Sequence, residues 1–234
     1  MAARRRGSRG RSGTGRHTGR TGVTAKLPQQ PPADLASRNP SWHTWPITDP
    51  LWHIANTSGP YATRFGAMRS YGPLASARFD PHPPPPGDHP TERVLYTDGD
   101  LVTAIAERFQ NGREIRCRQA TDPIVYSWMP TRPLRLLDIT DVSALRLGAS
   151  QLLSTGPKRH TRSWAIAIHA TWPDADGLLY QSSMAGRRCA ALWAPGADSF
   201  PHAPAFAKLL PDPAPAWIRL LRNTAAQIHD DFYP

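Results

Sequence analysis

The segment RVLYTDGDLVTAIAERF, residues 93–109, decides the fold class of this chain of 234 residues. Residues 93–97 combine branched and aromatic side chains and predict a β-strand. The Asp-Gly-Asp that follows predicts a turn and a helix N-cap, and Leu101, Ile105 and Phe109 recur at the spacing of a buried helical stripe. Glu107 lies about 200° from Ile105 around this helix, at roughly 100° per residue, so it points away from the stripe. We therefore expect a strand that leads directly into a helix carrying an off-stripe carboxylate.

The rest of the chain mixes strands and helices without regular alternation. Strands are expected at 50–55, 134–139, 178–182 and 188–193, and helices at about 142–153, 163–169 and 214–228. The segment 80–91 predicts a surface loop, because its consecutive prolines fit neither a helix nor a sheet interior. Since strands and helices do not alternate strictly, we predict an α+β fold of mixed small sheets with flanking helices.

The positive charge of the chain is concentrated at its N-terminus. Residues 1–26 hold eight Arg and Lys residues and no acid, so they carry +8 of the formal net charge of +10. This composition predicts a disordered basic tail over 1–33, followed by a linker over 34–48 and a folded domain over 49–234. The tail is either a nucleic-acid arm that binds phosphates or a solvated extension. It holds no aromatic residue to stack on bases, so nucleic acid is not expected as a partner except through the tail.

Several common site signatures are absent from the sequence. There is no phosphate-binding GxxxxGK, no HExxH, no GxSxG and no CxxC pair, and the nine histidines are scattered without metal-ligand spacing. No metal site is therefore expected. Cys117 and Cys189 read as free thiols in a reducing compartment. No window approaches the roughly 20 apolar residues of a membrane span, so we expect a soluble, cytoplasmic protein.

Three polar residues in separate apolar blocks form a candidate site for a charged nucleotide. Arg78 offers a bidentate fork for phosphate, Glu107 can bind a sugar hydroxyl or face a developing positive charge, and Ser182 adds a compact donor and acceptor. Taken singly, each has a plainer interpretation: a surface arginine, an exposed helix residue and an ordinary strand serine. Their joint significance depends on the blocks around them.

Taken together, the blocks resemble the RES domain, a bacterial family named for its arginine, glutamate and serine. The resemblance covers about residues 50–195, with Glu107 placed eleven residues after Tyr96. Its blocks are 51–54, 77–80, 94–107, 136–138, 176–182 and 189–193. One departure stands out, because the family usually has arginine in its first block where this chain has His53. Neutral histidine cannot replace a permanently charged guanidinium, so phosphate binding or activity is in question there.

The resemblance implies an ADP-ribosyltransferase-like fold with NAD+ as the substrate. It implies that Arg78 binds the pyrophosphate or the adjoining ribose and that Tyr96 packs against the nicotinamide ring. Glu107 would bind the ribose hydroxyl and favour the developing cation or orient the acceptor. Ser182 would hydrogen-bond the nicotinamide ribose or fix Glu107, and His53 would belong to the pocket wall.

The resemblance also implies a toxin of a toxin–antitoxin system whose partner is a helix-turn-helix (Xre-type) antitoxin. We expect an enzyme that cleaves the nicotinamide–ribose bond, with water or phosphate as the acceptor. One alternative is an ADP-ribosyltransferase that modifies a cellular protein. Another is a non-catalytic protein that binds NAD, or nucleic acid through the Arg-rich tail. The oligomeric state, including a homo-oligomer, stays open.

Overall fold

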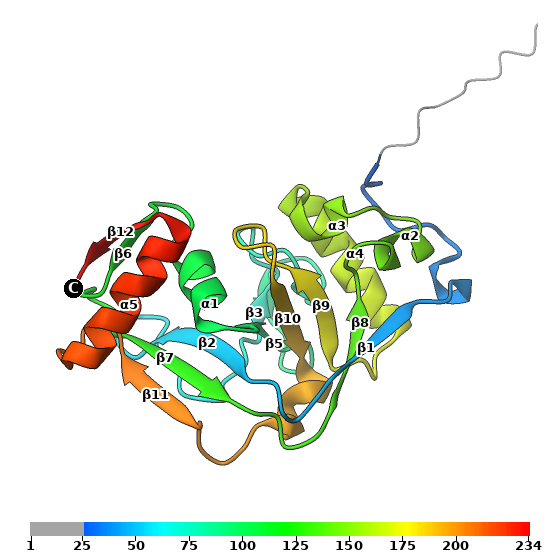
Figure 1. Cartoon of the computed structure of the whole chain (residues 1–234). Coiled ribbons are helices and arrows are strands. Elements are labelled where there is room, and N and C mark those ends of the chain that lie inside the picture. Colours follow the sequence, from blue (N-terminus) through cyan, green and yellow to red (C-terminus); the bar gives the residue numbers. More distant parts are fainter. Residues whose placement is uncertain (1–25) are drawn as a thin grey trace, which may run out of the picture.

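The computed structural model describes residues 26–234, which form a strongly curved eight-stranded sheet with helices packed inside its bend (Figure 1). In spatial order the strands are β1 (Ser41–Trp45), β8 (Leu134–Asp138), β9 (Gly177–Gln181), β10 (Arg188–Trp193), β5 (Val94–Asp98), β2 (Leu51–Asn56), β7 (Pro123–Trp128) and β11 (Phe206–Leu209). Strands β8 and β9 are parallel, and every other neighbouring pair is antiparallel. The predicted α+β class is confirmed.

Two small sheets accompany the large one, and none of their four strands was expected from the sequence. Strand β3 (Tyr71–Gly72) pairs with β4 (Gly87–Asp88), and β6 (Glu114–Arg116) pairs with β12 (Asp231–Tyr233). The helices are α1 (Leu101–Arg108), α2 (Ser143–Arg146), α3 (Leu152–Thr155), α4 (Lys158–Thr171) and α5 (Pro215–Ile228), with 3-10 turns η1 (Leu35–Ser37) and η2 (Ala194–Ser199). None of the helices within residues 26–234 has the length and apolar character that a membrane crossing requires.

The helices divide into two groups over the two ends of the sheet (Figure 1). Helices α2, α3 and α4 pack with β8, β9 and β10, where Trp164 and Trp193 are fully buried. Helices α1 and α5 pack with β2 and β7 around Ile105 and Leu221, which are also fully buried. Burial of these apolar side chains is the main stabilising contribution on each side. Two separate cores thus hold the two helix groups in place.

The strand-turn-helix segment that decided the fold class forms as predicted. Strand β5 leads to Asp100, whose side chain caps α1 by accepting a hydrogen bond from the Thr103 N–H at 2.9 Å. Leu101, Ile105 and Phe109 are buried, while Glu107 is only half-buried. The helix therefore buries its apolar stripe and turns Glu107 toward another part of the molecule.

Two expectations at the N-terminal side are corrected by the structure. Residues 1–25 of the expected tail lie outside the described residues, but Leu27 is only 6% exposed and packs in the core beside α4. Trp164 Nε1 donates a hydrogen bond to the Pro28 carbonyl at 2.9 Å. Residues 41–45 of the expected linker form β1, which pairs with β8. The prolines of this segment are typical of a linker, and the few apolar residues that anchor it between them form no periodic pattern.

The expected helix over 142–153 is also corrected, because it is two short helices, α2 and α3. Gly148 lies between them with φ +84°, a left-handed conformation that glycine adopts without strain and that ends α2. The expected helix at 163–169 is confirmed but begins earlier, as α4, and the helix at 214–228 is confirmed as α5. Strands β7 and β11 of the large sheet were also not expected, and β4 lies within the segment 80–91 that was expected to be a surface loop.

Candidate functional site

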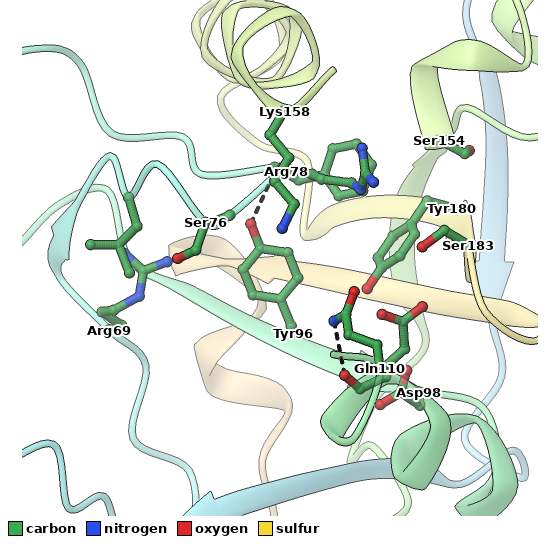
Figure 2. A pocket seen from close by; sticks show the side chains of 14 residues that line it. Arg69, Ser76, Arg78, Tyr96, Asp98, Gln110, Ser154, Lys158, Tyr180 and Ser183 are labelled. Carbon is green, nitrogen blue, oxygen red and sulfur yellow. Dashed lines mark hydrogen bonds between the residues drawn. The ribbon is translucent and has the colours of Figure 1, made fainter. Parts of the chain in front are cut away.

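A pocket of about 340 Å³ opens between the two helix groups (Figure 2). Its lining comes from the loop before β5, from β5 itself, from α1, from the α3–α4 region and from the end of β9. The lining residues are Arg69, Leu74, Ser76, Ala77, Arg78, Phe79, Tyr96, Asp98, Glu107, Gln110, Ser154, Lys158, Tyr180 and Ser183. The fold thus brings Arg78, Tyr96 and Glu107 together in one cavity.

Ser182 lies behind Glu107 rather than in the pocket lining. Its hydroxyl donates a hydrogen bond of 2.5 Å to Glu107 Oε1 and accepts from the N–H groups of Met184 at 3.1 Å and Ala185 at 2.9 Å. Ser182 is 3% exposed. Because a hydroxyl has one proton, and that proton goes to Glu107, the turn after β9 fixes the direction of the Glu107 carboxylate. Of the two contacts expected for Ser182, the geometry provides the one to Glu107.

Asp98 is a second carboxyl group in the pocket, and the sequence analysis assigned it only to the turn. It follows Tyr96 by two residues on β5, so both side chains lie on the same face of the strand. Asp98 is 9% exposed, and the Cys189 thiol of the neighbouring strand donates to its Oδ1 at 3.1 Å. Burial raises the pKa of Asp98 to about 7, with the Cys189 hydrogen bond opposing and nearby Glu107 adding to the rise. The period-two spacing from Tyr96 is the signal that could have identified it.

Tyr96 is held by a buried network around Asp80. The Tyr96 hydroxyl donates to Asp80 Oδ1 at 2.9 Å and accepts from the Phe79 N–H at 2.8 Å. Asp80, which is fully buried, also accepts from Arg69 Nη2 at 2.6 Å and from the Leu74 N–H at 2.8 Å. Burial and the nearby Asp80 charge raise the pKa of Tyr96, so the phenol stays neutral. The hydroxyl is fully engaged, which leaves the ring as the part of Tyr96 available to a ligand.

Arg78 and Lys158 supply positive charge on the opposite side of the pocket from Asp98 (Figure 2). Arg78 Nη1 donates to the Gly156 carbonyl in the turn between α3 and α4. Within residues 26–234, no carboxylate lies at ion-pair distance from either cation. We call the Arg78 and Lys158 side the basic end of the pocket and the Asp98 and Glu107 side its acidic end. The sequence identified Arg78 at the basic end and Glu107 at the acidic end.

His53 lies on β2 outside the pocket lining and supports Tyr96 from behind. Its Nδ1 is 3.0 Å from the Tyr96 carbonyl oxygen, so the neutral ring carries its proton on Nδ1 and donates it. Burial lowers the pKa of His53 to about 4, the Tyr96 hydrogen bond opposes this, and the Arg108 charge adds to the lowering. His53 therefore carries no charge at neutral pH. It contacts the backbone of a pocket residue and not the pocket space.

The part of the chain that the structure describes contains no evident group of metal ligands. No three His, Cys, Asp or Glu side chains gather there at metal-binding distances. Cys117 and Cys189 are both buried free thiols, and burial raises the pKa of each. The polar groups of the pocket are instead two carboxyls, several cations, hydroxyls and aromatic rings, which suit an organic ligand with charge of both signs.

Comparisons with known proteins agree with this architecture. The crystal structure of the M. tuberculosis MbcT–MbcA toxin–antitoxin complex contains a chain similar in fold, with a TM-score of 0.51 and 12% sequence identity. The similarity covers 83% of this chain and 98% of that one. No curated protein matches the sequence significantly. The model of the RES domain family matches residues 50–213, which extends the expected resemblance past residue 195 and includes every candidate site residue. Because this match spans most of the sequence, the chain belongs to the RES domain family.

Proposed function

We propose that the protein is a toxin-like enzyme that cleaves the nicotinamide–ribose bond of NAD+. The observation that carries the proposal is the Ser182–Glu107 hydrogen bond of 2.5 Å, which orients a carboxylate at one end of a pocket whose other end is cationic. NAD+ has matching polarity, since its nicotinamide ribose becomes more positive as the bond breaks while its pyrophosphate is negative. The acidic end would receive the ribose, and the basic end would receive the pyrophosphate.

The reaction needs positioning and electrostatic stabilisation more than acid catalysis. When the bond breaks, its electron pair goes to the ring nitrogen, nicotinamide leaves as a neutral molecule and the ribose becomes oxocarbenium-like. Glu107 would bind the ribose hydroxyl and stabilise this charge. Ser182 acts through Glu107 and is a positioning residue. The Tyr96 ring, fixed by Asp80 and the Phe79 N–H, would pack against the nicotinamide.

The acceptor decides the product. Attack by water on the ribose carbon gives ADP-ribose and releases a proton, and attack by inorganic phosphate gives the phosphorylated sugar. We propose one of these two NAD+-consuming routes. Modification of a protein side chain is the remaining alternative, and it predicts label transfer from NAD+ to protein.

The family and the structural neighbour support a biological setting for this reaction. The neighbour is named as a toxin–antitoxin complex. By analogy, this chain would act as the toxin of such a pair, and a helix-turn-helix antitoxin would be its partner. Expression of the chain alone should then lower cellular NAD+ and arrest growth. Co-expression of its antitoxin should restore both.

The direct test is release of nicotinamide from NAD+ by the purified full-length chain, measured with and without phosphate. Glu107→Ala and Arg78→Ala should each remove most of the release without unfolding the protein. Glu114→Ala is the matched control, because Glu114 pairs with Arg116 in β6 and does not line the pocket. Absence of release by the wild type at any phosphate concentration, together with unchanged cellular NAD+ on expression, would refute the proposal.

A further inference from the structure

Asp98 is a carboxyl group of the pocket that the proposed reaction does not yet use. Its side chain is 9% exposed and lines the cavity at the acidic end, away from Arg78 and Lys158 (Figure 2). Oδ1 accepts the hydrogen bond from Cys189. Oδ2 has no hydrogen-bond donor within residues 26–234 and is not fully enclosed. Asp98 therefore offers one free carboxylate oxygen to a molecule in the cavity.

The neighbouring strand fixes the direction of this carboxyl group. Cys189 of β10 is the register partner of Asp98, and its thiol donates to Oδ1 at 3.1 Å. The carbonyl oxygen of Arg187, another acceptor for the thiol, is farther away at 3.7 Å. Burial raises the pKa of the Cys189 thiol, so the thiol keeps its proton and stays a donor. Oδ1 is thus fixed against β10, which leaves Oδ2 as the oxygen available to the cavity.

The proposed reaction needs a second carboxylate because Glu107 is engaged with the ribose. Ser182 donates to Glu107 Oε1 at 2.5 Å, and in the proposed reaction the Glu107 carboxylate faces the oxocarbenium-like sugar. If Glu107 also took up a proton, it would lose the negative charge that stabilises this cation. Attack by water on the ribose carbon releases a proton, so that proton requires a different acceptor.

The surroundings of Asp98 suit a proton acceptor for a neutral molecule. The titratable side chains around it are Glu107 of α1, Asp100 of the following turn, Cys189 of β10, Tyr180 of β9 and Tyr96 of β5 itself. Within residues 26–234, no Arg, Lys or His lies at ion-pair distance from Asp98. Burial raises the pKa of Asp98 to about 7, close to the pH at which a general base is most effective. Two neighbouring carboxyl groups without a cation repel a phosphate ion, whereas water is not repelled.

We infer that Asp98 is the general base of the reaction and that it makes water the acceptor. Oδ2 of the ionised Asp98 takes a proton from water while the water oxygen forms its bond to the ribose carbon. The electron pair of the bond between this carbon and nicotinamide goes to the ring nitrogen, and neutral nicotinamide leaves. The products are ADP-ribose, nicotinamide and a protonated Asp98, which returns its proton to solvent. This inference rests on the proposed function and selects hydrolysis among its routes.

The first test follows nicotinamide release and its products in the purified full-length protein, with and without phosphate. The wild type should form ADP-ribose in both cases, at the same rate. Its kcat/KM should fall as the pH is lowered through about 7, because only the ionised Asp98 accepts a proton. Asp98→Asn should fold, since it removes a buried ionisable group, but should lower kcat about 100-fold and lose the pH dependence near 7. Asp141→Asn, at an exposed position outside the pocket lining, should change neither.

Azide separates a base from a residue that only supports the fold. Azide is an anionic nucleophile with no proton to lose, so it should restore nicotinamide release by Asp98→Asn and form the ribosyl azide. The wild type, whose ionised Asp98 repels azide, should not respond. Cys189→Ala removes the hydrogen bond that favours the ionised carboxyl group, so its kcat/KM should begin to fall at a higher pH. Cys189→Ser keeps a donor and should reverse this shift.

The outcomes distinguish the inference from the proposed function. A phosphorylated sugar as the main product, or wild-type activity in Asp98→Asn, would overturn the role of Asp98 and leave NAD+ cleavage intact. A loss of activity in Asp98→Asn that azide does not restore, with the pH profile unchanged, would also overturn it, because Asp98 would then only support the fold. Absence of nicotinamide release by the wild type would refute the proposed function, and the inference with it.

Discussion

The acidic and basic ends of the pocket are held by different kinds of structure. Glu107 and Asp98 project from a helix and a strand of the main fold, and each has a hydrogen-bond partner in the free protein, Ser182 and Cys189. The basic end comes from a loop and from the turn between α3 and α4, where Lys158 has no carboxylate at ion-pair distance within residues 26–234. The carboxyl groups of the acidic end therefore have partners without a ligand, whereas the Lys158 charge at the basic end does not.

This difference assigns different roles to the two ends. Groups that are already oriented need no reorganisation when charge develops, so they act on the transition state. Groups that gain their partners only from the ligand act on binding. Substitutions at the acidic end should therefore lower kcat, and substitutions at the basic end should raise KM. The largest free-energy effects are expected at Asp98 and Glu107, and smaller ones at the supporting residues Ser182 and His53.

The largest effect concerns the stability cost of burying Asp98 in the acidic end. Its pKa is raised from 3.8 to about 7, so between these values the native state keeps a proton that the unfolded chain has lost. The free energy of unfolding should then fall as pH rises from about 4 to about 7, by up to about 4 kcal/mol. Asp98→Asn should match the wild type near pH 4 and exceed it near pH 8. Urea unfolding at the two pH values measures this.

A matched control for Asp98 is Asp141→Asn, at an exposed position. It should leave the pH dependence of the wild type intact. If Asp98→Asn shifts stability equally at both pH values, Asp98 ionises normally in the folded protein. The acidic end would then contain two ordinary carboxylates.

Glu107→Gln tests the assignment of the chemical step to the acidic end. Glutamine keeps the length of the side chain and can still accept from Ser182, but it removes the charge that would face the oxocarbenium. We expect kcat to fall about 100-fold, equivalent to about 3 kcal/mol, with KM changed less than threefold. Initial rates of nicotinamide release over a range of NAD+ concentrations separate the two constants. A defect in KM alone would contradict the assignment of the acidic end to the chemical step, since it would show that Glu107 acts on substrate binding.

Ser182→Ala should have a smaller effect, because Ser182 acts only through Glu107. Loss of the hydrogen bond frees the carboxylate to rotate, and kcat should fall about tenfold, or about 1.5 kcal/mol. The readout specific to positioning is a double-mutant cycle. In the Glu107→Gln background, Ser182→Ala should cost little further, whereas additive losses would show an independent role for the hydroxyl.

The same contrast explains how far the sequence could predict the site. The spacing of Leu101, Ile105 and Phe109 indicated that Glu107 points away from the buried stripe of its helix. Tyr96 was identified only through the resemblance to the RES domain, by its place eleven residues before Glu107. The Ser182–Glu107 contact joins residues 75 positions apart, yet each lies in a recognisable apolar block. Helical periodicity therefore indicated the direction of Glu107, and the resemblance supplied its contact with Ser182. Asp98 was not predicted as a site residue because the Asp-Gly-Asp sequence was interpreted only as a turn and a helix N-cap.

The basic end was largely beyond sequence reasoning. Lys158 begins α4, directly after the turn between α3 and α4. The sequence predicted one helix over 142–153 and another over 163–169, so it gave no helix start at Lys158. A conformational break at Gly148 and a close approach at Gly156 set the path of this segment. Such contacts depend on the tertiary path of the chain and leave no repeating pattern in the sequence. For the same reason the pairing of β1 with β8 was missed.

The smallest effect is expected at His53, the position that departs from the family pattern. In the structure this neutral ring donates from Nδ1 to the Tyr96 carbonyl and faces away from the pocket lining. His53→Asn places an amide nitrogen close to the position of Nδ1 and keeps that donor. We therefore expect less than a threefold change in kcat/KM, below about 0.7 kcal/mol.

Because burial lowers the pKa of His53 to about 4, the ratio of variant to wild-type activity should stay constant from pH 6 to pH 8. A ratio that changes near pH 6.5 would mean that His53 titrates in contact with substrate, and a large loss would give it a role at the site equal to that of the residues in the pocket. His53→Arg should destabilise the fold instead of strengthening phosphate binding, because it would bury a fixed charge near Arg108 at a position that does not line the pocket.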